Sequence, residues 1–387
     1  MISKMLRDVQ SREIIRVLTL FAVWWLILQA FAVIVYKRVD FVKPDRAYSW
    51  VNVTDINVTT EWPEWFGLHS RWDSGFYIWI AQYGYHHDNA AFLPLYPLSI
   101  RIATMGWSIL TGAAPTLDAF TGVGVIISNI SALGTALGLY ALARLDLSES
   151  DAEHALFYFL IFPTAFFLTV VYAESLFMFW VVTSVYFARR HRWLFASALG
   201  ACAVLTRVTG LWLFPTLLVE WWGIHREQKW QGVALLLMPM AFLAYEIYLR
   251  TQGMSFFVSQ QEVFGRWPLD PTALLKNIDF EYLWLHAAAQ AHHIIEIAIA
   301  IGVMLLSLYA GKQLRPSYGV FGLLCVLGPL LTGTIVSLER YSLAAFPIFL
   351  VLGRNRHLEW LESGYTLSAI LLLGLYTLFF VGGYWAG

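Results

Sequence analysis

Residues 17–36 read VLTLFAVWWLILQAFAVIVY, an apolar run without a charged side chain. A helix that crosses a bilayer needs about 20 apolar residues at a rise of 1.5 Å per residue, and this run meets that length. A signal peptide also begins with basic residues, but its apolar region is shorter, and this run continues past the small-residue site at 30–32. We therefore expect residues 17–36 to form a retained first transmembrane helix.

The composition of the whole chain extends this expectation. Of its 387 residues, 59% are hydrophobic and 13% are charged. Soluble domains carry roughly 25% charged residues, so lipid is the expected surroundings of most of the chain. The net charge of −1 gives no basic field that would attract nucleic acid, and we expect no nucleic-acid partner.

Further apolar runs predict an all-α polytopic membrane protein that forms one domain over residues 1–387. We expect about eleven spans, within two either way, at residues 17–36, 119–143, 155–171, 174–188, 193–205, 209–222, 233–249, 291–310, 318–336, 342–353 and 365–385. The run 92–110 holds Arg101 and two prolines, which favours an interfacial helix over a span, because a charge at the bilayer centre costs about 2.5–3.5 kcal/mol.

The distribution of basic residues predicts the orientation. Short loops on the cytoplasmic side of a membrane are enriched in Lys and Arg. With the N-terminus in the cytoplasm, the short loops on that side hold Arg189, Arg190, Arg192, Arg226, Lys229, Lys312, Arg315, Arg354 and Arg356. Two long loops, 37–118 and 250–290, then lie on the extracytoplasmic side. Trp79, Ile80 and Tyr83 recur at helical spacing, so we expect interfacial helices in the first of these loops.

The first long loop carries the most informative polar motif of the chain. Residues 71–77 read RWDSGFY, and residues 92–97 read FLPLYP. A carboxylate held between aromatic side chains at a membrane surface is a candidate base, which makes Asp73 a candidate catalytic residue. A solvated carboxylate or a turn residue is the alternative interpretation of Asp73.

Other polar turns are expected on the same face. They contribute Glu174, Arg207, Gln260 and Arg340. Separate segments that bring acids and arginines to one face are typical of an active site at a membrane surface. Glu174 could instead be a plain turn acid, and Arg207 and Arg340 could extend to lipid headgroups. An arginine beside an acid also suits a lipid phosphate, which a guanidinium group binds in a bidentate manner.

No pattern predicts a metal or a cofactor. His86, His87 and Asp88 are adjacent, and adjacent residues rarely share one tetrahedral site. Cys202 and Cys325 both lie in apolar runs, where cysteines behave as small buried hydrophobes.

The motifs, taken in order, resemble those of the PIG-V family, which includes the second mannosyltransferase of GPI-anchor assembly and many prokaryotic relatives. The resemblance rests on RWD with Tyr77, on PLYP at 94–97, YAESLF at 172–177, TRVTG at 206–210, FVSQ at 257–260 with Trp267, and RY at 340–341 before Phe346-Pro347. Leu93 and the Leu338-Glu339 pair depart from the family pattern, and neither belongs to the proposed chemistry. The chain is also shorter than eukaryotic members, which points to a prokaryotic relative.

The resemblance implies a GT-C-type glycosyltransferase fold, a polyprenyl- or dolichyl-phosphate-linked donor with mannose as the sugar, and no metal. It implies Asp73 as the catalytic carboxylate. We expect inverting transfer on the extracytoplasmic face of a prokaryotic plasma membrane, to a lipid- or glycan-linked acceptor. Arg207 and Arg340 are the expected ligands of the donor phosphate. The expected contacts to sugar or acceptor are Arg71, Trp72, Tyr77, Glu174, Gln260, Trp267 and Tyr341.

Three alternative functions stay open at the level of sequence. The chain could be a non-catalytic GT-C-like subunit of a glycosylation complex, or a transferase of another sugar such as glucose, galactose or aminoarabinose. A transporter or flippase of lipid-linked sugars is the third. Transporters place ionisable residues near the bilayer midplane and often have related halves, whereas the polar residues here gather at loop ends.

Overall fold

The computed structural model describes residues 9–39, 66–223, 226–267, 270, 272 and 291–386. Within these ranges every regular element is a helix, which confirms the all-α prediction. Residues 40–65 of the first long loop and most of 268–290 in the second lie outside the described residues.

Five described helices are long and apolar enough to cross a membrane. They cover Ser11–Arg38, Leu117–Ala143, Trp230–Thr251, Ile294–Gln313 and Leu361–Gly382. Two shorter apolar helices, Trp193–Thr206 and Pro316–Leu330, accompany them. The chain is thus a membrane protein of several spans, and the count of about eleven stays a prediction.

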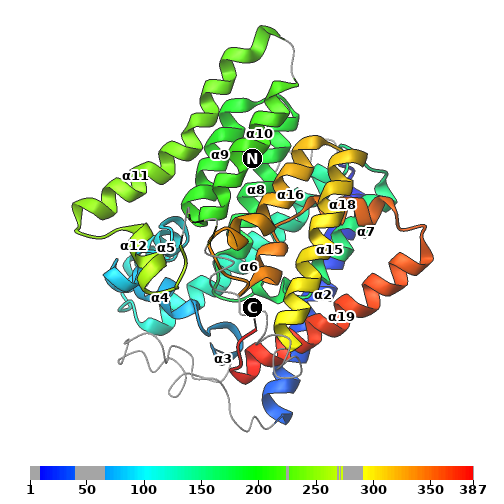
Figure 1. Cartoon of the computed structure of the whole chain (residues 1–387). Coiled ribbons are helices and arrows are strands. Elements are labelled where there is room, and N and C mark those ends of the chain that lie inside the picture. The colour runs from blue at the N-terminus through cyan, green and yellow to red at the C-terminus, as the bar shows by residue number, and fades with distance from the viewer. Residues whose placement is uncertain are drawn as a thin grey trace.

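The helices occupy the chain in the following order (Figure 1). They are α2 (Ser11–Arg38), α3 (Phe66–His69), α4 (Ser74–Tyr83), η2 (His87–Asn89), α5 (Leu95–Thr111), α6 (Leu117–Ala143), α7 (Glu149–Leu160), η3 (Ala165–Leu168), α8 (Glu174–Arg189), α9 (Trp193–Thr206), η4 (Val208–Trp212), α10 (Leu213–Trp222), η5 (Arg226–Leu236), α11 (Leu237–Thr251), α12 (Phe256–Glu262), α15 (Ala291–Gln313), α16 (Pro316–Leu330), α17 (Leu338–Ser342), α18 (Pro347–Arg354) and α19 (Glu359–Gly382).

Prolines divide some of the expected spans into shorter helices. The run 155–171 is not one helix, because α7 ends at Leu160 and a 3-10 turn, η3, follows Pro163. Proline has no N–H to donate and disfavours a helical conformation of the residue before it. Likewise, Pro347 begins α18, so the expected span 342–353 starts late, at a position where proline's missing N–H costs nothing.

The two helices expected in the first long loop are present. Residues 74–83 form α4, and the run 92–110 forms α5, which begins just after Pro94. The two helices pack against each other and against α6. Their packing carries the RWD motif, which directly precedes α4, onto the helical bundle.

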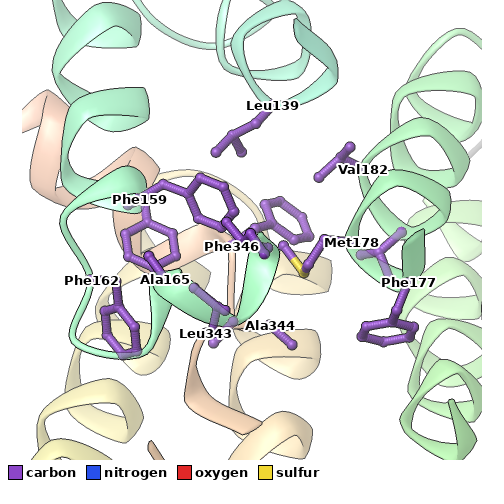
Figure 2. Close-up of a cluster of buried hydrophobic side chains, with 14 of the residues drawn as sticks. Leu139, Phe159, Phe162, Ala165, Phe177, Met178, Val182, Leu343, Ala344 and Phe346 are labelled. Carbon is purple, nitrogen blue, oxygen red and sulfur yellow. The ribbon is translucent and has the colours of Figure 1, made fainter. Parts of the chain in front are cut away.

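One buried apolar cluster joins the helices of the bundle centre to the turn that holds Arg340 (Figure 2). Phe159 and Ala165 come from α7 and η3, and Phe177 comes from α8. Leu343 and Phe346 follow α17 and insert among them. Since large aromatic side chains in a close-packed core leave little freedom, this cluster fixes the position of the polar turn beside it.

The polar turns lie at two opposite ends of the bundle. Helix α8 separates them, with Glu174 at its first residue and Arg189 at its last. Its 16 residues extend over about 24 Å. At the Arg189 end, Arg189 pairs with Asp146 at 2.5 Å and Arg315 pairs with Glu220 at 2.7 Å. The Glu174 end holds the cavity described next.

Candidate active site

A cavity of about 610 Å³ opens at the Glu174 end of the bundle. Segments from six parts of the chain form its wall. Its polar and aromatic lining includes Trp72, Asp73, Tyr77, Arg207, Gln260, Phe264, Arg266, Ser337, Arg340, Tyr341 and Trp385. A cavity of this size, with a few convergent polar groups on an apolar wall, is the common form of a small-molecule site.

An ion pair between Asp73 and Arg340 lies on this wall. Nη1 of Arg340 donates to Oδ2 of Asp73 at 2.8 Å. Asp73 is 8% exposed and Arg340 is 6% exposed, so both charges are removed from bulk water. Buried charges are tolerated when they are paired, and truncation of one partner leaves the other charge uncompensated.

A second ion pair lies beside the first. Arg207 pairs with Glu174, and Nε of Arg340 lies 3.6 Å from Oε1 of the same carboxylate. Glu174 therefore contacts both guanidinium groups. The two acids and two arginines form one buried network in which the charges balance, and Glu174 supports the cavity from behind its lining.

Two residues that precede members of this network in the sequence have a left-handed backbone conformation. Trp72 has φ +54°, and Ser337 has φ +69°. Few residues other than glycine adopt positive φ, and a bulky side chain there is a genuine outlier. Such conformations persist where the surrounding structure holds them, often at functional sites. Both residues also line the cavity. They lie next to Asp73 and to the start of α17, whose residues Arg340 and Tyr341 line it as well.

Aromatic side chains pack against the Asp73–Arg340 ion pair. The guanidinium of Arg340 lies 5.5 Å from the ring of Phe167 and 5.6 Å from that of Tyr172. The backbone N–H of Asp73 donates to the Tyr172 hydroxyl at 3.2 Å. Tyr172 therefore contacts both members of the pair. Cations over desolvated aromatic faces gain about 1–2 kcal/mol.

Tyr341 lies between two further guanidinium groups. The ring centroid is 5.4 Å from the guanidinium of Arg207 and 5.6 Å from that of Arg266. Nη1 of Arg266 donates to the Tyr341 hydroxyl at 2.7 Å. Burial alone would raise the pKa of Tyr341, but the charges of Arg266, Arg207 and Arg340 lower this pKa below its ordinary value.

Gln260 reaches the cavity from α12, which is anchored by a buried acid. Glu246 of α11 accepts the Ser255 hydroxyl at 2.8 Å and the Phe256 backbone N–H at 2.9 Å. These bonds fix the first turn of α12. The Ser259 hydroxyl accepts the backbone N–H of Ala91 at 3.1 Å, which joins α12 to the loop before α5.

Not every predicted contact residue lies at the cavity. Trp72, Tyr77, Gln260 and Tyr341 line it. Arg71 is outside the lining, and its Nη2 donates to the backbone oxygen of Val381 at 3.1 Å. Trp267 is also outside, with 47% of its surface exposed.

Arg266 and Trp385 line the cavity without having been predicted as site residues. Arg266 stands directly before the motif tryptophan Trp267, and this position was the signal in the sequence that could have found it. Trp385 packs edge-on against Trp72, with ring centroids 5.2 Å apart. This contact joins the C-terminal end of the described chain to the RWD motif, and no sequence spacing could have indicated it.

Behind the Arg340 turn lies a pair of buried acids. Glu339 is 1% exposed and lies beside Glu296 of α15, and neither of its carboxyl oxygens has a hydrogen-bond partner among the described residues. Two buried carboxyl groups close together disfavour each other's charged form. Burial, and next the charge of Glu296, raise the pKa of Glu339 well above its ordinary value. Within the ranges that the structure describes, no three His, Cys, Asp or Glu side chains are grouped so as to hold a metal ion.

A family model described as mannosyltransferase (PIG-V) matches residues 13–223. The match includes Asp73, Glu174 and Arg207, while Arg266 and Arg340 lie beyond it. The chain is also 26% identical over 208 residues to GPI alpha-1,6-mannosyltransferase 2 of Cricetulus griseus, over 53% of this chain and 41% of that protein. It is 26% identical over 193 residues to GPI mannosyltransferase 2 of Yarrowia lipolytica, over 49% of this chain and 51% of the relative. These alignments span about half the length of the relatives, or less.

Solved structures also align with the chain. An oligosaccharyltransferase of Archaeoglobus fulgidus tethered with an acceptor peptide aligns with a TM-score of 0.43 and 13% identity, covering 94% of this chain and 56% of that chain. The Archaeoglobus fulgidus enzyme in complex with an inhibitory peptide and a dolichol-phosphate aligns with a TM-score of 0.40 and 13% identity, over 94% of this chain and 56% of the other.

Proposed function

Because the chain belongs to the PIG-V mannosyltransferase family, whose model matches more than half of it, we propose that it transfers mannose from a polyprenyl- or dolichyl-phosphate donor to a lipid- or glycan-linked acceptor. The observation that carries the proposal is the buried Asp73–Arg340 pair on the cavity wall. In this proposal Asp73 is the proton acceptor and Arg340, beside it, is a ligand of the leaving phosphate.

Asp73 acts as the general base of this reaction. An acceptor hydroxyl attacks the anomeric carbon of the donor sugar from the face opposite the phosphate. The new carbon–oxygen bond forms as the bond to the phosphate oxygen breaks, so the configuration inverts. The hydroxyl proton passes to the Asp73 carboxylate, and the lipid phosphate leaves with the bonding electron pair.

Arg340 and Arg207 stabilise the charge that develops on the phosphate. A guanidinium group has five N–H donors, so Arg340 can keep its bond to Asp73 while it binds an oxygen of the phosphate. Fixed donors in a water-poor site stabilise a developing anion without reorganisation. Trp72, Tyr77, Gln260 and Tyr341 surround the sugar or the acceptor, and Glu174 holds the two arginines in register.

We also propose an orientation for the chain in the membrane. The arginine-rich turns lie at the Arg189 end of α8, opposite the cavity. Under the positive-inside rule that end faces the cytoplasm, so the cavity faces the extracytoplasmic side and the N-terminus is cytoplasmic.

Asp73→Asn tests the assigned base. The amide keeps the size of the side chain but cannot accept the proton, so transfer should fall by about 10²- to 10⁴-fold. Membranes that contain the protein are incubated with labelled polyprenyl-phosphate-mannose, and the label that leaves the donor is measured by chromatography.

Asp146→Asn is the matched control. It makes the same chemical change in an acid that also pairs with an arginine, at the far end of α8 from the cavity. Asp146→Asn should keep the transfer rate per folded molecule. Near-normal turnover of Asp73→Asn would show that Asp73 is not the base.

A further inference from the structure

The three arginines of the cavity differ in their partners. Arg207 pairs with Glu174, and Arg340 pairs with Asp73 and approaches Glu174. Arg266 lines the same cavity but forms no ion pair with any carboxylate of the described residues. Among the described residues, two of the three guanidinium groups are therefore already neutralised, and Arg266 carries the remaining positive charge.

The contacts of Arg266 leave most of its donors available. Its only side-chain hydrogen bond to the described residues is the one from Nη1 to the Tyr341 hydroxyl at 2.7 Å. Its guanidinium also lies 5.6 Å from the Tyr341 ring and 5.9 Å from the Phe264 ring. Within the part of the chain that the structure describes, one of its five N–H donors is used, and two aromatic rings pack against the guanidinium group. A half-buried, oriented guanidinium with free donors is well suited to bind an anion.

An apolar surface adjoins this cation. The backbone N–H of Trp267 donates to the Thr332 oxygen at 2.9 Å, which joins the Arg266 segment to residues 331–336. Leu331 is 50% exposed, Val336 is 38% exposed, and Trp267 is exposed beside them. A cation next to exposed apolar side chains suits a ligand with an anionic head and an apolar tail.

We propose that Arg266 binds the phosphate of the lipid-linked donor before the reaction begins, with Tyr341 holding its guanidinium in position. The single positive charge that it adds to a balanced network matches the single negative charge of a phosphodiester. The prenyl chain then leaves the cavity past Trp267, Leu331 and Val336. This inference rests on the proposed function for the identity of the donor, and Arg340 and Arg207 act afterwards on the leaving phosphate.

Arg266→Ala and Arg266→Lys test the proposal in full-length protein in nanodiscs of zwitterionic lipid. A short-chain prenyl phosphate without sugar serves as the binding probe, followed by tryptophan fluorescence, and polyprenyl-phosphate-mannose serves for turnover. Arg266→Ala should weaken probe binding and raise the donor KM by roughly ten- to hundredfold with little change in kcat. Arg266→Lys should recover part of the affinity for the probe, because lysine keeps the positive charge but lacks the paired N–H donors of the guanidinium group.

Two further variants test whether the change in donor KM is specific to Arg266 and to its contact with Tyr341. Arg192→Ala removes an exposed arginine at the opposite end of α9 and should leave donor KM unchanged. Tyr341→Phe removes the hydroxyl that accepts from Arg266, and it should add little to the loss already caused by Arg266→Ala, because both changes affect one contact.

The outcomes distinguish this inference from the proposed function. An unchanged donor KM in Arg266→Ala, in protein that transfers mannose, overturns the role of Arg266 and leaves the function standing. Probe binding that depends on Arg266, in protein that transfers no mannose from any lipid phosphate, supports the anion site and contradicts the function. An effect of Arg266→Ala that occurs only in anionic nanodiscs would assign Arg266 to membrane headgroups and overturn the proposal.

Discussion

Glu339 is a carboxyl group whose surroundings favour its protonated form. It faces Glu296 of α15, Arg340 of its own turn and Tyr376 of α19, and burial is the largest cause of its raised pKa. An acid whose pKa is higher in the folded than in the unfolded state binds its proton more tightly when folded. Its contribution to stability is therefore complete below the ordinary glutamate pKa, and it is lost as the pH rises towards the folded value.

Glu339→Gln should remove this pH dependence. The amide keeps the shape and a hydrogen-bond donor but does not titrate. Thermal unfolding in detergent, followed from pH 5 to 8, should show wild-type stability falling with pH by up to about 1.4 kcal/mol per pH unit for one proton, and a flatter profile for the variant. Glu359→Gln, an exposed acid at the start of α19, should keep the wild-type slope. A slope that Glu339→Gln leaves unchanged would mean that Glu339 is already ionised.

At this scale the sequence indicated residues with special chemistry but not their partners. Asp73 was visible in the polar motif of the first long loop, and Glu174, Arg207 and Arg340 were visible as charges in polar turns between apolar runs. That Arg340 would pair with Asp73, 267 positions away, depends on the helical packing and not on spacing. Arg266 is adjacent to the motif residue Trp267, but what distinguishes it from Arg207 and Arg340 is that no carboxylate of the described residues pairs with it, and this could not be predicted from sequence.

The turn between α9 and η4 shows how an element positions a charge. Arg207 adopts an extended conformation at the end of α9, and Gly210 folds back onto the last turns of that helix. A Cβ at Gly210 would lie 2.5 Å from the carbonyl carbon of Ala203 and closer still to the Val204 nitrogen. Only a residue without a side chain allows η4 to pack there, which explains the glycine of the TRVTG motif.

Gly210→Ala should therefore displace η4 and the guanidinium of Arg207 together. Because backbone atoms cannot move aside as a flexible side chain can, we expect a loss of stability of about 1–3 kcal/mol together with weaker donor binding. Thermal unfolding and donor KM measure the two effects. Gly106→Ala is the matched control, since a Cβ there meets nothing within 4 Å and alanine is the better helix former in α5. Equal stability of the two variants would contradict the account of this turn.

The elements themselves were predictable where length or proline determines them. The run 17–36 became α2, and the motif at 74–83 became α4, because apolar length and helical periodicity are local properties. The run 155–171 was wrongly expected as one span, although Pro163 within it was the signal that the helix would end. Hydrophobicity alone does not separate a spanning helix from a buried irregular segment such as η3.

At the scale of the whole molecule, the charges define two ends. The predicted polar turns meet at one cavity, and the arginines of the short loops gather at the other end of α8, where Asp146, Asp151 and Glu220 neutralise part of their charge. The number of spans could not be fixed from sequence, because several buried helices are too short to cross a bilayer alone. The distribution of Lys and Arg nevertheless predicts which end faces the cytoplasm.

Cysteine labelling tests this orientation directly. Gln261→Cys places a thiol on exposed α12 at the cavity end, and Arg192→Cys places one at the exposed start of α9 at the opposite end. A maleimide that does not cross membranes, applied to intact cells, should label Gln261→Cys at once and label Arg192→Cys only after the cells are opened. The wild-type chain measures the background, because its free Cys325 is buried and Cys202 is only partly accessible. The reverse pattern would place the cavity in the cytoplasm, and a soluble nucleotide sugar would then replace the lipid phosphate as the donor to test.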